Sequence, residues 1–171
     1  MALPVTFIYP PYYEGYLKRA ALQNTLLENL RQSKTQGIDF FSLVPVAKES
    51  FAYSPGKWTV KEVLQHCIDT ERIFAYRALR FARNDQTELA GYNEETYGKE
   101  MCCEGRSLVQ MVREFERLRD TTIDLFECFS EEELARDGVA SGQRISVEAI
   151  GYILTGHLLH HVEVVRNRYL L

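Results

Sequence analysis

The sequence predicts an all-α fold in which four long helices pack as an antiparallel four-helix bundle. Apolar residues recur at spacings of three, four and seven in four separate stretches, as they do on the buried face of a helix. No stretch shows the sustained alternation of apolar and polar residues that indicates a strand. The 171 residues are 46% hydrophobic and 26% charged, and they contain no repeat, linker or low-complexity tract. We therefore treat residues 1–171 as a single domain.

The first predicted helix covers residues 15–44. The preceding pair Pro10-Pro11 forces an extended or turned backbone, and Pro45 ends the helix because a proline restricts the residue before it. Gly37 interrupts the apolar pattern. One face of this segment carries the apolar residues Leu22, Leu26, Leu30, Phe40 and Val44.

The second predicted helix begins after a turn signal at residues 54–56 and ends near residues 84–85. Thr59 and Glu62 have the spacing of a capping box, in which each side chain accepts a hydrogen bond from the other residue's backbone N–H. The apolar face that follows consists of Val60, Leu64, Cys67, Phe74, Ala78 and Phe81.

A long connection, residues 85–106, follows the second helix. Connections of this length are often functional or form lids, and the alternative is an ordered connection whose tyrosines pack on the bundle. It contains the adjacent Cys102 and Cys103, which together with Cys67 and Cys128 show no CxxC or zinc-finger spacing. We expect free thiols in a reducing cytosol, and a redox or metal role for the adjacent pair stays open.

The last two predicted helices begin at Ser107 and Ser146, and the final one continues to about residue 169. Between them, a short helical turn follows Ser130, and residues 137–144 are predicted as a loop because they contain two glycines. The third helix has the apolar face Leu108, Met111, Phe115, Leu118, Thr122, Leu125 and Phe129. The corresponding face of the fourth consists of Val147, Ile150, Leu154, His157, His161 and Val165.

Charge and hydropathy exclude several classes of protein. The net charge of -4 argues against a nucleic-acid-binding protein. No apolar run approaches the ~20 residues that a membrane-spanning helix needs, so we expect no membrane association. Residues 1–16 lack the basic start and apolar core of a signal peptide, and we therefore expect a cytoplasmic location.

The histidines are the most informative polar residues. His157 and His161 lie four residues apart, so both project from one face of a helix, and that face is the apolar one. Each imidazole carries a donor and an acceptor that need partners when buried. His66, beside Cys67 on the second helix, could join them in a three-histidine site. Such a site suits zinc, nickel, copper or ferrous iron and leaves a position open for water or substrate.

Other interpretations of the histidines stay open at this point. A histidine on an apolar face is often a hydrogen-bonded core residue, and the pair His157 and His160 could also chelate a metal ion. Asp69, one turn after His66, could accept the spare imidazole N–H or act as a fourth ligand.

Two segments of the chain resemble the DinB/YfiT-like metalloenzymes. Residues 55–85 resemble the second helix of that family, in particular Gly56-Lys57-Trp58 followed by the capping residue Thr59 and by His66. Residues 144–170 resemble its last helix, and the two segments occur in the family's order and separation. The resemblance extends over essentially the whole chain. Trp58 is interpreted as a structural residue at the entry to the second helix.

The resemblance implies an up-down-down-up four-helix bundle with metal ligands at His66, His157 and His161. Zinc or nickel are the favoured ions, with iron or manganese as alternatives, and homodimers are common in the family. Some relatives are S-transferases or isomerases that use a low-molecular-weight thiol such as bacillithiol or mycothiol. Our leading hypothesis is therefore a metal-dependent, thiol-dependent S-transferase that acts on a small-molecule substrate.

Further roles follow from this hypothesis as expectations. Asp69 would orient His66, the connection with Tyr92 and Tyr97 would close over the substrate, and Arg72 and Arg77 would bind a carboxylate of the thiol. The alternatives are a metal-dependent hydrolase and a non-catalytic metal-binding stress-response bundle. The presence or absence of thiol dependence would separate the two enzymes.

Overall fold

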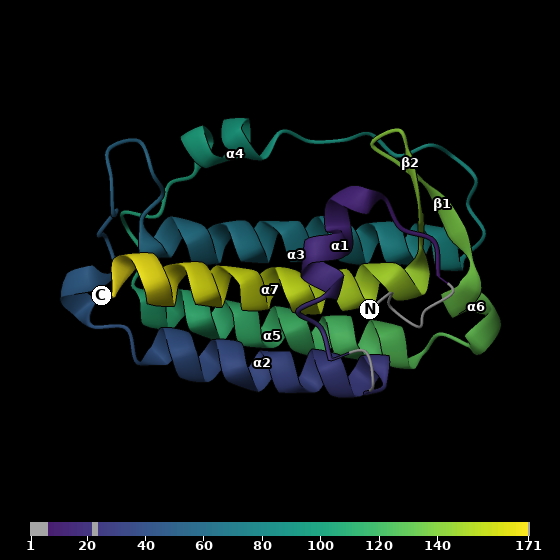
Figure 1. Cartoon of the computed structure of the whole chain (residues 1–171), viewed down its shortest axis with the longest axis horizontal. Helices are drawn as coiled ribbons and strands as arrows, with labels where there is room; N and C mark the ends of the chain where they lie inside the picture. The colour runs from purple at the N-terminus through teal and green to yellow at the C-terminus, as the bar shows by residue number, and fades with distance from the viewer. Residues whose placement is uncertain (1–6, 22–23, 171) are drawn as a thin grey trace.

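The computed structural model describes residues 7–21 and 24–170, and four long helices form the body of this part of the chain (Figure 1). They are α2 (Leu26–Ser42), α3 (Val60–Ala82), α5 (Leu108–Glu127) and α7 (Val147–Tyr169). Helices α2 and α7 run in one direction and α3 and α5 in the other, which confirms the up-down-down-up order. Each of α3 and α2 packs against both α5 and α7.

The capping residues fix where the long helices begin. Thr59 and Ser107 open capping boxes as predicted, and Ser146 accepts a hydrogen bond from the N–H of Ala149 at the start of α7. The predicted first helix is wrong in its start, because Thr25 forms a further capping box with Glu28 and α2 begins after it. Ahead of it lie only the short helices η1 (Pro11–Tyr13) and α1 (Glu14–Leu17) within the described residues.

Gly37, which interrupts the apolar pattern in the sequence, lies on the buried side of α2. It is buried within the helix, and a Cβ atom built there would lie 3.0 Å from a methyl group of Leu158 on α7 and 3.3 Å from the Phe115 ring on α5. Its role is close helix packing. Leu22, which the sequence placed on this apolar face, lies outside the described residues.

The predicted loop at residues 137–144 is a β-hairpin instead. Strands β1 (Asp137–Ala140) and β2 (Gln143–Ser146) pair antiparallel and follow the short helix α6 (Glu131–Ala135). Their two-residue turn, Ser141-Gly142, has φ angles of 55° and 71°, and φ is positive at both central residues of type I′ hairpin turns. Each strand has only four residues and few large apolar side chains, so no alternation was visible in the sequence.

The connection between α3 and α5 must return along the whole bundle because these two helices run parallel (Figure 1). It is held by the hairpin, since Leu89 N–H donates to Val139 O at 2.9 Å and Ser141 N–H donates to Leu89 O at 3.0 Å. The predicted loop also contains a short helix, α4 (Glu94–Glu100), which Asn93 caps. We call residues 83–107 the crossover.

A buried ion pair joins three of the long helices. Arg119 on α5 donates to both carboxylate oxygens of Glu71 on α3, at 2.7 and 2.9 Å, and to Ser33 Oγ on α2 at 2.7 Å. The remaining connection, between α2 and α3, contains the short helix η2 (Val46–Lys48). Across the described ranges, every helix is too short or too polar to pass through a membrane.

Candidate metal centre

The structure brings together His66, His157 and His161. His66 comes from α3, and the other two come from successive turns of α7. The Nε2 atom of His157 lies 3.0 Å from that of His66 and 3.2 Å from that of His161. In the described part of the chain, these three form the one cluster of at least three possible ligands, with ligand atoms within 4.8 Å of one another.

The donor atoms of this cluster fit a divalent ion. Zinc–nitrogen bonds of about 2.0–2.1 Å at tetrahedral angles place the nitrogen atoms about 3.3 Å apart. The two measured separations are close to this value. The Nε2 atom of His157 carries either one N–H or one lone pair. Without an ion, it would have to share this with two other Nε2 atoms at once. The Nδ1 atom of His161 is buried and has no hydrogen-bond partner among the described residues.

Burial keeps the three imidazoles neutral, which is the form that binds metals. It lowers the pKa of His66 from 6.5 to about 4, with a smaller contribution from His160. The pKa values of His157 and His161 are also lowered well below the usual value, mainly by burial and then by neighbouring histidines. His66 and His157 are 4% and 6% exposed.

Two aromatic side chains enclose the cluster, and the sequence assigned neither to it. The indole of Trp58 packs on His66 with a ring-centroid distance of 4.8 Å, so this residue contacts the site as well as the entry to α3. Tyr16 on α1 contacts His157 edge-on at 5.2 Å. A Cβ atom on Gly156 would lie 1.9 Å from Tyr16 O, which shows how closely α1 packs on α7.

Other predicted site residues lie elsewhere. The Oδ1 atom of Asp69 accepts hydrogen bonds from Gln65 at 2.9 Å and from Arg72 at 3.4 Å, and none joins it to His66 in the described structure. Arg72 in turn pairs with Glu114 on α5. His160 lies outside the ligand cluster and contacts Tyr16, at a ring-centroid distance of 5.5 Å.

The cysteines take no part in the cluster. Cys102 is exposed, whereas Cys103 is buried in the core beside the start of α5. Neither thiol belongs to a group of three possible metal ligands within the described residues.

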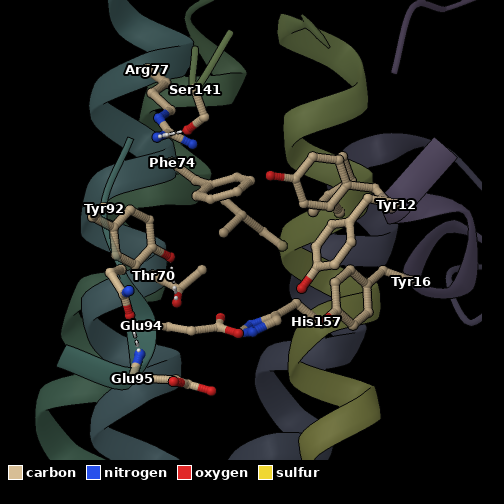
Figure 2. A pocket seen from close by; sticks show the side chains of 14 residues that line it. Tyr12, Tyr16, Thr70, Phe74, Arg77, Tyr92, Glu94, Glu95, Ser141 and His157 are labelled. Atoms are coloured by element: carbon tan, nitrogen blue, oxygen red, sulfur yellow. Dashed lines mark hydrogen bonds between the residues drawn. The ribbon is translucent and has the colours of Figure 1, made fainter. Parts of the chain in front are cut away.

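Two cavities open on either side of the histidines. The first, the Arg77 cavity, has a volume of about 420 Å³ and is lined by α1, α3, α7, the hairpin turn and the crossover (Figure 2). Its lining includes His157, Tyr16, Thr70, Phe74, Arg77, Tyr92 and Ser141. The second, the Trp58 cavity, has a volume of about 750 Å³, and its lining includes His161, Trp58, Glu62, Lys99 and Tyr169.

The crossover forms part of both cavities. Glu94 and Glu95, at the start of α4, line each of them. Tyr92 also lines the Arg77 cavity, and its hydroxyl lies 3.2 Å from Thr70 Oγ1. Tyr97 packs on Tyr92 at a ring-centroid distance of 5.2 Å. The crossover therefore lines the site through Tyr92, Glu94 and Glu95, and its tyrosines pack on the bundle and on each other. Its closure over a substrate stays a prediction.

The chain is similar to a known sequence family and to several solved structures. The sequence profile of the DinB superfamily matches residues 20–165, and no curated protein matches the chain. The structure is similar to YfiT from Bacillus subtilis, described as a probable metal-dependent hydrolase with an unusual four-helix bundle topology. The identity is 16% and the TM-score 0.67, over 96% of this chain and 92% of YfiT.

Two further solved structures share the fold. A mycothiol-dependent maleylpyruvate isomerase is 14% identical with a TM-score of 0.65, and the match covers 82% of this chain but only 60% of the isomerase. The DinB-like protein YjoA from Bacillus subtilis is 12% identical with a TM-score of 0.61, over 84% of this chain and 87% of YjoA. At these identities the comparisons show a common four-helix bundle.

Proposed function

The chain belongs to the DinB superfamily, and on that premise we propose that it is a metal-dependent transferase that uses a small thiol. His66, His157 and His161 would hold one divalent ion, with zinc or nickel favoured and iron or manganese as alternatives. The convergence of their three Nε2 atoms is the observation that carries the proposal. Held there, the ion would supply Lewis acidity and lower the pKa of a bound thiol.

The two cavities favour transfer between two molecules. His157 borders the Arg77 cavity and His161 borders the Trp58 cavity, so a thiol and its acceptor could each approach the cluster from its own side. Trp58 and Tyr16 cover two of the histidine rings and reduce the access of water to them. A solved structure with the same bundle fold is described as a mycothiol-dependent isomerase, which supports the choice of a thiol as cofactor.

A metal-dependent hydrolase is the second candidate. The observation that favours it is the pair Glu94 and Glu95, whose carboxylates line both cavities and could accept a proton from water. Figure 2 shows Glu94 reaching from the crossover into the Arg77 cavity. YfiT, which has the same fold, is described as a probable metal-dependent hydrolase.

Thiol dependence tests these candidates. Metal-loaded protein should conjugate monochlorobimane, a fluorogenic electrophile, to bacillithiol or mycothiol faster than the uncatalysed reaction. His161→Ala should abolish the acceleration, and His160→Ala, a substitution one residue away, should retain it. Hydrolysis of aryl esters in buffer without thiol would support the hydrolase instead. Metal binding that stabilises the fold without either reaction would support a non-catalytic stress-response bundle.

Two further expectations stay predictions. The family resemblance suggests a homodimer, which sedimentation equilibrium of the purified protein would test. A cytoplasmic location also stays a prediction, which a fluorescent fusion would test.

A further inference from the structure

Arg77 is a buried cation without an acidic partner. Only 4% of its surface is exposed. None of the ion pairs within residues 7–21 and 24–170 includes Arg77, and the residues outside these ranges carry no Asp or Glu. An arginine stays protonated in proteins, so a positive charge is held here away from bulk water.

The hydrogen bonds of Arg77 leave this charge uncompensated. Its Nη2 atom donates to Ser141 Oγ at 3.1 Å and to Ala90 O at 3.3 Å, and both acceptors are neutral. The other buried arginine, Arg119, is matched by both oxygens of Glu71. The guanidinium also interacts with the hydroxyl of Tyr13, which is neutral as well. It has five N–H donors in all, so these three partners do not use every one of them.

Arg77 and His157 both line the Arg77 cavity but lie far apart in it. Figure 2 shows Arg77 and Ser141 at one end of the cavity and His157 towards the other. Along α3, Arg77 lies eleven residues after His66, which corresponds to about 16 Å along the helix axis. Thr70 and Phe74 lie between them and line the same cavity.

The walls and the opposite end of the cavity suit an amphipathic ligand. Phe74 and Tyr92 lie beside the guanidinium, at 5.1 and 5.8 Å from ring centroid to Cζ. Tyr12, Tyr13 and Tyr16 face them from the N-terminal segment. Glu94 and Glu95 lie towards the His157 end in Figure 2, so an anionic group is favoured at Arg77 and disfavoured beside them.

We propose that Arg77 is the binding site for the carboxylate of an elongated small-molecule substrate. Its guanidinium can hold both carboxylate oxygens in parallel hydrogen bonds. An apolar or aromatic segment of the ligand would lie along Phe74 and the tyrosines, with its reactive group beside His157. The placement of the reactive group rests on the proposed function, whereas the carboxylate site does not.

Calorimetric binding of phenylpropionate and its neutral amide, phenylpropionamide, tests this site. Chelator-treated full-length protein is used, because a carboxylate could also bind a metal ion. We expect the carboxylate to bind at least about tenfold more tightly than the amide, as removal of a charged hydrogen-bond partner predicts. Arg77→Met should remove this preference. Arg80→Met, which deletes an arginine on the same helix that does not line the cavity, should retain it.

The ratio of the two dissociation constants separates binding from a structural role. If Arg77 only links the crossover to the hairpin, Arg77→Met would lower the unfolding temperature and the ratio in the parent would be near one. Equal affinities for the two probes in the parent, or binding of neither, would overturn the proposal even if Arg77→Met fails to fold. A preference for the carboxylate in a protein that binds no metal would uphold this site and reject the proposed function.

Discussion

The Nε2 atoms of His66 and His157 lie 3.0 Å apart, although 91 residues separate them in the sequence. They meet because α3 and α7 pack side by side in opposite directions. Both rings are buried and neutral, and a hydrogen bond between them uses one proton for two nitrogen atoms. With His161 at 3.2 Å from the same atom, the single N–H or lone pair of His157 Nε2 faces two neighbouring nitrogen atoms at once.

Replacing Gly156 by alanine should disturb the cover of the site. The new Cβ atom would lie 1.9 Å from the backbone oxygen of Tyr16, which cannot move without displacing α1 from α7. We expect a loss of about 1–3 kcal/mol in the free energy of unfolding, measured in urea, as overpacking usually produces. Gly105→Ala is the control, because a Cβ atom at that position would have no described atom within 4 Å. Equal stability of the two variants would contradict this packing.

Removing Arg119 should destabilise the bundle strongly. Arg119→Met leaves the carboxylate of Glu71 buried without its partner, and we expect a loss of about 3–5 kcal/mol in the free energy of unfolding. The double variant Arg119→Met with Glu71→Leu should recover much of this loss, since no unpaired charge remains. Chemical denaturation of the three proteins provides the comparison. If Arg119→Met is as stable as the parent, the pair is not fully desolvated.

The stability contributed by Glu114 should depend on pH. Burial raises the pKa of this carboxyl group, but hydrogen bonds from Arg72 and Arg106 outweigh it and hold the pKa below 4.5. The folded state therefore binds a proton less readily than the unfolded state, and the contribution is present above pH 4.5 and lost below it.

Glu114→Gln tests this dependence. At neutral pH we expect the variant to be less stable by about 1 kcal/mol, because the pair is partly exposed. The difference should shrink as the pH falls below 4.5. Urea unfolding of both proteins over this range gives the comparison, and a difference that stays constant would argue against the ion pairs as its cause.

Much of the bundle could be predicted because local signals agree with the packing. The spacing of Thr59 with Glu62 and of Ser107 with Gln110 predicted two helix starts that the structure confirms. The start of α2 was missed although Thr25 and Glu28 have the same spacing, because the apolar pattern continues upstream of them. The hairpin was missed because its strands are too short to establish a period.

The site was only partly predictable, since several contacts depend on how distant segments pack. His66, His157 and His161 could be selected from helical spacing and the family resemblance, and the structure brings them together. Asp69 was proposed from spacing alone, and its hydrogen bonds go to Gln65 and Arg72 instead. Tyr16 reaches the site from outside the four long helices, and nothing in its local sequence indicated this.

The sequence also indicates the buried ion pair, because two charged residues occupy positions on the apolar faces of their helices. Arg119 lies four residues after Phe115 and three before Thr122, so it occupies the apolar face of α5. Glu71 lies in the same way between Cys67 and Phe74 on α3. Opposite charges on the apolar faces of two helices predict a pair between those helices.

The most direct test is the metal content of the protein purified without an affinity tag and reconstituted with zinc or nickel. We expect about one ion per chain by elemental analysis after dialysis, as a single three-histidine cluster predicts. His157→Ala should lose the ion, and His160→Ala should keep it. A parent protein that retains no ion, or a His157→Ala variant that retains as much as the parent, would contradict the proposed metal centre.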